Sequence, residues 1–240
     1  MPDRVGHTVA MTRAAWLLLG YGVLSGVHVV GQALDATAVT TATKPLLMPV
    51  LAAYLLAASA RPLSRMTRLV LIALGFSWLG DVLLLGDGEV WFIAGLLGFL
   101  LAQITYIVTF VPAVRARPDG RPPLPGLVFV LFGAVMVGVL APDVGALLLP
   151  VMVYVAAICT MAVVAPAVNL WTAAGATLFV ASDSILALSI FTDRLSGSES
   201  LTGVLVMSTY TLAQGLIVHG VVVAQRAPSR IAAPTAPRLK

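Results

Sequence analysis

Long apolar runs separated by short polar segments dominate the chain. The runs cover approximately residues 14–34, 45–59, 69–86, 90–111, 126–141, 146–165, 170–190 and 201–224. Most are long enough for a helix to cross about 30 Å of hydrocarbon at about 1.5 Å per residue. They lack the polar alternation of a transmembrane barrel, and open strands do not cross lipid. The pattern predicts an all-α, polytopic bundle of eight transmembrane helices, of which the second and fifth are the shortest.

The composition agrees with a membrane location. Of the 240 residues, 60% are hydrophobic and 10% are charged, and the mean hydropathy is +1.02. A soluble domain carries far more charge on its surface. A net charge of +4 would suggest nucleic acid in a soluble chain. Here we assign it to basic loops facing an anionic leaflet, so membrane lipids and no nucleic acid are the expected partners.

The basic residues predict an orientation. Placing the N-terminus in the cytoplasm puts twelve of the fourteen Lys and Arg residues on that side, and leaves Lys44 and Arg194 outside. This is a positive-inside pattern with both termini cytoplasmic. The excess of arginine over lysine, with much Ala, Gly and Val, suggests a GC-rich bacterial genome, so we expect the inner (plasma) membrane of a bacterium. We expect a cytoplasmic segment over 1–13, the transmembrane domain over 14–224, and a disordered basic tail over 225–240.

Two further patterns bear on the organisation of the chain. "TRAAWLLLGYGVLSG", followed by "ATA" at 36–38, resembles a signal peptide, but the apolar stretch is long for one and is interrupted by His28. "GDVLLL" and "SDSILAL" each precede a helix with a glutamine, in Phe99-x-x-x-Gln103 and Tyr210-x-x-x-Gln214. This correspondence suggests a parallel repeat of four plus four helices.

Two carboxylates lie inside the apolar runs. Asp81 is twelve residues beyond Leu69 and Asp183 twelve beyond Trp171, at the inner ends of their helices, which places both about 18 Å from the cytoplasmic face. A charge at that depth costs several kcal/mol unless it is paired or hydrated, so both side chains should face the bundle interior or a cavity. The same layer is expected to contain three more polar groups: His28, Lys44 and Tyr210. Ser77 lies one turn before Asp81 on the same helix face, and Ser182 is next to Asp183. Lys44 is placed at the outer start of the second helix, with Pro45 in its first turn.

The polar inventory restricts the chemistry. HExxH, GxSxG and Walker A motifs are absent from the sequence, and two intramembrane histidines at opposite depths do not build a three-histidine zinc site. We therefore expect no metal and no cofactor. The residues suit metal-free acid–base chemistry, proton-coupled transport of a small solute, or a structural polar cluster between helices. Gln103 and Gln214 lie deeper, where amides often form interhelical hydrogen bonds.

Five segments in order carry a resemblance to a known family. "ATKPLLMP", "SWLGDVLLL", "GLLGFLLAQITYI", "ASDSILAL" and "YTLAQGLIV" resemble the lysoplasmalogenase, or YhhN-like, family, over residues 14–224. The resemblance implies a membrane enzyme that hydrolyses the vinyl ether bond of lysoplasmalogens to a fatty aldehyde and a glycerophospho-base. The polar residues that match the family motifs are Lys44, Asp81, Gln103, Asp183, Tyr210 and Gln214. His28 belongs to none of these motifs.

The implied reaction is compatible with these residues. It needs one carboxyl that stays protonated near neutral pH and one carboxylate that stabilises a cation and activates water, and two carboxyls in a low-dielectric layer provide such a pair. The resemblance therefore implies Asp81 and Asp183 as catalytic residues, with a lysophospholipid as substrate. Lys44 would hold the lipid phosphate. The alternatives are a proton-coupled transporter, a lipid-binding membrane protein and a structural membrane module.

Overall fold

The protein is a bundle of eight α-helices over the described part of the chain. The computed structural model describes residues 2–192 and 199–226, with side chains from residue 12 onward. The helices are α1 (Pro2–Ala33), α2 (Thr37–Ala58), α3 (Arg65–Leu83), α4 (Glu89–Arg115), α5 (Val128–Leu140), α6 (Leu148–Val164), α7 (Leu170–Phe191) and α8 (Glu199–Arg226). The all-α, eight-helix prediction is confirmed. Most of the predicted tail 225–240 lies outside the described residues, as does Arg194.

Seven helical segments of the described chain are long and apolar enough to cross a bilayer. The exception is α5, which has 13 residues and spans about 20 Å at about 1.5 Å per residue, short of the hydrocarbon thickness. A 3₁₀ turn at Leu124–Leu127 precedes it and extends its apolar stretch. The chain is an integral membrane protein in which α5 is the short member.

The start of α2 differs from the prediction. The helix begins at Thr37, so Lys44 lies two turns inside it, and Pro45 is interior, not in the first turn. Threonines before Lys44 are tolerated inside the helix because their hydroxyls find partners in preceding carbonyls. The Thr43 hydroxyl, for example, donates to the Val39 carbonyl at 2.7 Å. Hydropathy alone assigns such threonines to a loop, because it does not include this local hydrogen bonding.

The prolines of α2 create a docking point for α3. Pro49 lies four residues after Pro45 and has no N–H, so the Pro45 carbonyl loses its usual helical partner. The indole Nε1 of Trp78, on α3, donates to this carbonyl at 2.9 Å. A neighbouring helix thus satisfies the freed backbone group, as a membrane interior requires.

Glycines allow two helix pairs to pack at very short distance. A Cβ added to Gly98 on α4 would lie 2.9 Å from the Gly80 nitrogen on α3, and one added to Gly175 on α7 would lie 2.7 Å from the Ala213 oxygen on α8. Small residues let membrane helices approach in this way. Each of these two pairs contains one of the aspartate motifs, on α3 and on α7. The internal repeat of four plus four helices stays a prediction.

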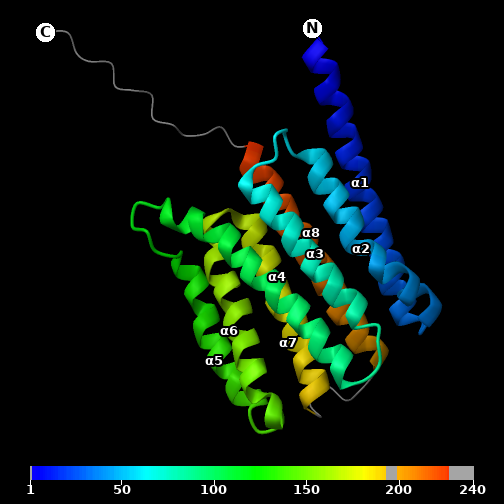
Figure 1. Cartoon of the computed structure of the whole chain (residues 1–240), viewed down its shortest axis with the longest axis vertical. Coiled ribbons are helices and arrows are strands. Elements are labelled where there is room, and N and C mark those ends of the chain that lie inside the picture. Colours follow the sequence, from blue (N-terminus) through cyan, green and yellow to red (C-terminus); the bar gives the residue numbers. More distant parts are fainter. Residues whose placement is uncertain (1, 193–198, 227–240) are drawn as a thin grey trace, which may run out of the picture.

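The two pairs form the centre of the bundle. In Figure 1, α1 and α2 lie on one side, α5 and α6 lie on the other, and α3, α4, α7 and α8 lie between them. The main apolar core runs through the central helices. A smaller cluster of Met136, Leu140, Val144 and Val151 packs separately between α5 and α6, with α7 alongside. The side of the bundle at α5 and α6 therefore has its own small core.

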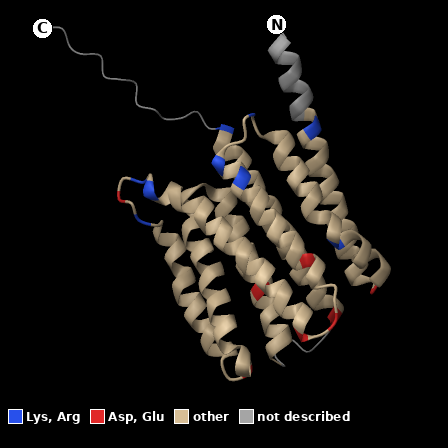
Figure 2. Ribbon diagram, viewed as in Figure 1, with Lys and Arg blue, Asp and Glu red and all other residues tan. Residues whose placement is uncertain are grey.

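The charged residues are distributed unevenly along the bundle. Figure 2 shows most of the described Lys and Arg residues gathered at one end of the bundle. The described arginines lie on α1, just before α3 and in its first turn, at the end of α4, in the following loop and at the end of α8. In that loop the Arg117 Nε lies 3.4 Å from the Asp119 Oδ1. The backbone N–H of Arg121 holds the pKa of the exposed Asp119 carboxyl below its usual value.

Candidate active site

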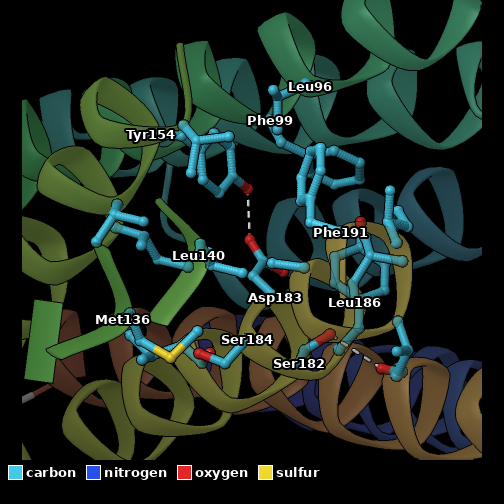
Figure 3. A pocket seen from close by; sticks show the side chains of 18 of the residues that line it. Leu96, Phe99, Met136, Leu140, Tyr154, Ser182, Asp183, Ser184, Leu186 and Phe191 are labelled. Carbon is cyan, nitrogen blue, oxygen red and sulfur yellow. Dashed lines mark hydrogen bonds between the residues drawn. The ribbon is translucent and has the colours of Figure 1, made fainter. Parts of the chain in front are cut away.

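A cavity of about 140 Å³ lies between helices α2 to α8, and it contains both membrane aspartates. Most of its lining is aliphatic or aromatic, as Figure 3 shows. Its polar lining consists of Lys44, Asp81, Tyr154, Ser182, Asp183, Ser184 and Tyr210. The structure thus brings together five of the residues singled out from the sequence: Lys44, Asp81, Ser182, Asp183 and Tyr210.

The carboxyl of Asp81 is held by a phenol from α8. Asp81 is only 1% exposed, and the Tyr210 hydroxyl donates to its Oδ2 at 2.7 Å. The ring of Tyr210 is itself fixed between Phe99 and Phe179, in edge-to-face contacts with centroids 5.7 and 5.5 Å apart. Aromatic pairs prefer this geometry. The position of the Asp81 carboxyl is therefore set by three further helices.

The carboxyl of Asp183 is held in the same manner by a phenol from α6. The Tyr154 hydroxyl donates to the Asp183 Oδ2, and both side chains point into the cavity (Figure 3). Asp183 is half-buried, so it is more accessible than Asp81. The two carboxyls lie close enough to interact electrostatically. Each aspartate is thus paired with a tyrosine of another helix.

Sequence reasoning missed Tyr154. It lies within the apolar run 146–165, where a tyrosine is easily assigned to packing. Its hydroxyl could have suggested a role, because a buried phenol needs a hydrogen-bond partner and the middle of a membrane helix offers few such partners. Of the two aspartates singled out, Asp183 is the nearer to Tyr154 in the sequence.

Lys44 is the one Lys or Arg among the described residues that line the cavity. Its side chain is half-buried, and it forms no ion pair with any described carboxylate. It interacts electrostatically with Asp81 and with His28. Lys44 lies two turns inside α2, and its charge faces the same cavity as the two aspartates.

His28 lies beside Lys44 but does not line the cavity. Its Nδ1 is 2.8 Å from the Thr43 hydroxyl. Since that hydroxyl already donates to the Val39 carbonyl, the ring N–H of His28 is the donor in this contact. His28 therefore fastens α1 to α2 next to Lys44.

Gln214 and Ser77 belong to a buried hydrogen-bond chain outside the cavity lining. The Tyr106 hydroxyl donates to the Gln214 Oε1 at 2.7 Å, and the Gln214 Nε2 donates to the Ser77 Oγ at 2.9 Å. This chain links α4, α8 and α3. The Ser182 hydroxyl makes a similar link, donating to the Val206 carbonyl at 3.0 Å. These contacts join helices in the manner expected of membrane polar residues.

Gln103 differs from Gln214 in its surroundings. It is 0% exposed, and neither atom of its amide has a hydrogen-bond partner among the described residues. It lies beside Tyr154, without reaching hydrogen-bond geometry. A buried polar group left without a partner costs about 1–3 kcal/mol. The Gln103 amide therefore lowers the stability of the folded protein, and it does not link two helices by a hydrogen bond.

The arrangement can move protons in an apolar setting. Two carboxyls and two phenols converge on one cavity with a nearby ammonium. Such groups serve as general acids and bases when they lie within reach of a bound molecule. Among the described residues, no group of three or more His, Cys, Asp and Glu could hold a metal ion.

Comparison with known proteins identifies the family to which the chain belongs. Residues 39–221 match the model of the YhhN family. The chain belongs to the YhhN family. Proteins named lysoplasmalogenase from Mycobacterium bovis and Mycobacterium tuberculosis are each 33% identical to it over 235 residues, which covers 92% of this chain and 87% of the relative. No solved structure matches it significantly.

The resemblance based on five sequence motifs is thereby confirmed. All five segments lie within the part that matches the YhhN family, and so do all seven polar residues that line the cavity. His28 lies outside the matched residues.

Proposed function

We propose that this YhhN protein hydrolyses the vinyl ether bond of lysoplasmalogens, releasing a fatty aldehyde and a glycerophospho-base. The observation that carries the proposal is the presence of Asp81 and Asp183 in one largely apolar cavity inside the membrane. The mycobacterial relatives named lysoplasmalogenase support the choice of substrate. A substrate with a long alkenyl chain and a charged head group suits a cavity that is apolar except for its carboxyls and one cation.

The reaction would begin with protonation of the alkenyl carbon that is β to the ether oxygen. One carboxyl of the pair supplies this proton, and the product is an oxocarbenium cation. The other carboxylate stabilises the cation. Water adds to the carbon that bears oxygen and gives up one proton to a carboxylate of the pair, which yields a neutral hemiacetal. The hemiacetal then breaks its bond to the glycerol oxygen, which yields the aldehyde and the alcohol. Two neighbouring carboxyls in a low-dielectric site share one proton and so provide both roles.

The shape of the cavity suggests how the lipid binds. Its apolar wall comes largely from α4, α5, α6 and α7, including Phe92, Leu140 and Phe191. The alkenyl chain would lie against this wall, because it gains the free energy of apolar burial there. The phosphate would lie at Lys44, because Lys44 is the cation of the lining. This arrangement places the ether bond near the two aspartates.

The orientation is also part of the proposal. The gathering of arginines at one end of the bundle (Figure 2) supports cytoplasmic termini, by the positive-inside rule. In a bacterial inner membrane the cavity would then lie nearer the outer leaflet. Helices α3 and α7 run unbroken through Asp81 and Asp183. Unbroken helices do not favour a transporter, since many transporter sites are built from interrupted ones.

The test is direct. Purified protein in detergent should release fatty aldehyde from a lysoplasmalogen, detected by mass spectrometry. A protein that folds correctly but releases none would contradict the proposed function.

A further inference from the structure

The two buried glutamines, Gln103 and Gln214, differ in their hydrogen bonding. Each lies on the second helix of one close-packed pair, and each is 0% exposed. Both amide atoms of Gln214 are bonded to other helices, whereas neither amide atom of Gln103 is bonded within the described residues. Buried polar groups are nearly always hydrogen-bonded, so an exception needs an explanation. Gln103 does nothing for the resting fold that an apolar side chain would not do.

Gln103 lies next to the cavity. It is one turn after Phe99, on the same face of α4, and Phe99 lines the cavity. Its amide lies close enough to Tyr154 to influence that phenol, but the contact falls outside the geometry of a direct hydrogen bond. Tyr154 donates its own proton to Asp183. The unpartnered amide therefore points to the side of the cavity where Tyr154 holds Asp183.

The chemistry of these groups suits a water molecule. A phenol that donates one hydrogen bond can still accept another, and an amide offers both a donor and an acceptor. Polar groups that face each other beyond direct hydrogen-bond distance are commonly bridged by water. A buried water is stable where it finds two to four polar partners, and the Gln103 amide with the Tyr154 oxygen supplies three.

We propose that Gln103 and Tyr154 hold the hydrolytic water, and that Asp183 accepts the proton of this water. The proposal rests on the proposed function, since only a hydrolase needs this water. The water oxygen forms a bond to the oxocarbenium carbon, and the proton that it loses passes to the Asp183 carboxylate. Asp81 is then the donor of the proton to the alkene. One proton leaves Asp81 for the alkene and one later arrives at Asp183 from water, so the pair begins and ends the reaction with one proton. That proton passes back from Asp183 to Asp81 before the next turnover.

Stability separates this role from a structural one. Gln103→Met keeps the size of the side chain and removes an amide that has no partner, so the thermal midpoint should stay the same or rise. Gln214→Met is the matched control, because it leaves Tyr106 and Ser77 without their partner and should lower the midpoint. Gln103→Leu provides a second apolar variant. A fall in both Gln103 variants as large as in the control would overturn the premise that the amide is unpartnered.

Kinetics test the role itself. Gln103→Met should lower kcat by about 10²-fold, the lower end of general acid–base contributions. KM for the lysoplasmalogen should change little, because Gln103 holds the water and does not touch the lipid. An unchanged kcat would overturn the proposal.

Isotope exchange identifies the step. In D₂O a cation that water does not capture loses a proton from carbon and returns to substrate, now carrying deuterium at the alkenyl carbon. Substrate recovered from the wild type should contain no deuterium, whereas substrate recovered from Gln103→Met should contain it. A slow variant whose recovered substrate has no deuterium would overturn the water role. Failure of the proposed function gives a different result, since the wild type itself would then release no aldehyde.

Discussion

Replacing Asp81 or Asp183 by asparagine removes the exchangeable proton and keeps the size of the side chain. In the structure, the Tyr210 hydroxyl donates to a single oxygen of Asp81 at 2.7 Å. The Tyr154 hydroxyl likewise donates to a single oxygen of Asp183. The one carbonyl oxygen of asparagine can accept the same bond. The loss of stability should therefore stay within about 1 kcal/mol, the scale of one altered hydrogen bond.

The expected loss of activity is much larger. Each variant should lose about 10²-fold or more in kcat/KM, the range of general acid–base catalysis. In free energy that is about 2.7 kcal/mol, since tenfold corresponds to about 1.36 kcal/mol. If the two carboxyls act as one unit, the double variant should lose little beyond the worse single variant. Independent roles would instead multiply to about 10⁴-fold.

The assay measures aldehyde release from a lysoplasmalogen by the four proteins in one detergent, together with their thermal midpoints. Full activity in a single variant would remove that aspartate from the reaction. Variants that lose their fold along with their activity would show that the aspartates serve as ties between helices, and the argument from shared catalysis would fail.

Three further predictions concern binding, packing and topology. Lys44→Met should raise KM about 10-fold or more with little change in kcat, the cost of a charged hydrogen bond; unchanged values of both would place the lipid phosphate elsewhere. Gly98→Ala should destabilise the protein by about 1–3 kcal/mol, because its Cβ would lie 2.9 Å from the Gly80 nitrogen. Gly75→Ala, where a Cβ meets nothing within 4 Å, should not be destabilised. Reporter fusions at the C-terminal tail and near Arg194 should lie on opposite sides of the membrane, and a common side would refute the assigned orientation.

Hydropathy was sufficient to predict the helices because each run had to satisfy its own backbone inside lipid. The boundaries were less accurate where polar residues continue a helix. At α2, a threonine-rich segment that looks like a loop is helical, and the Thr43 hydroxyl is satisfied by a carbonyl of its own helix. Lys44 therefore lies further into the helix than expected. Window-averaged hydropathy does not detect such local bonds.

The candidate site was only partly accessible from the sequence. Asp81 and Asp183 stood out because a carboxylate in an apolar run is costly. Tyr154 did not stand out, because a tyrosine is common in such runs and its partner Asp183 is 29 residues away. Gln103 and Gln214 look equivalent in sequence, and only the packing around them shows that one is bonded and the other is not. Tertiary contacts of this kind have no local signature.

The central claim is tested most directly by the substrate itself. Purified wild-type protein should be given a lysoplasmalogen and, separately, the lysophospholipid with the same head group and an ester-linked chain. The account predicts fatty aldehyde from the first and no fatty acid from the second, because a carboxyl pair that protonates an alkene has no alkene to act on in the ester. Absence of aldehyde from a folded, membrane-extracted protein, or equal cleavage of both lipids, would contradict it.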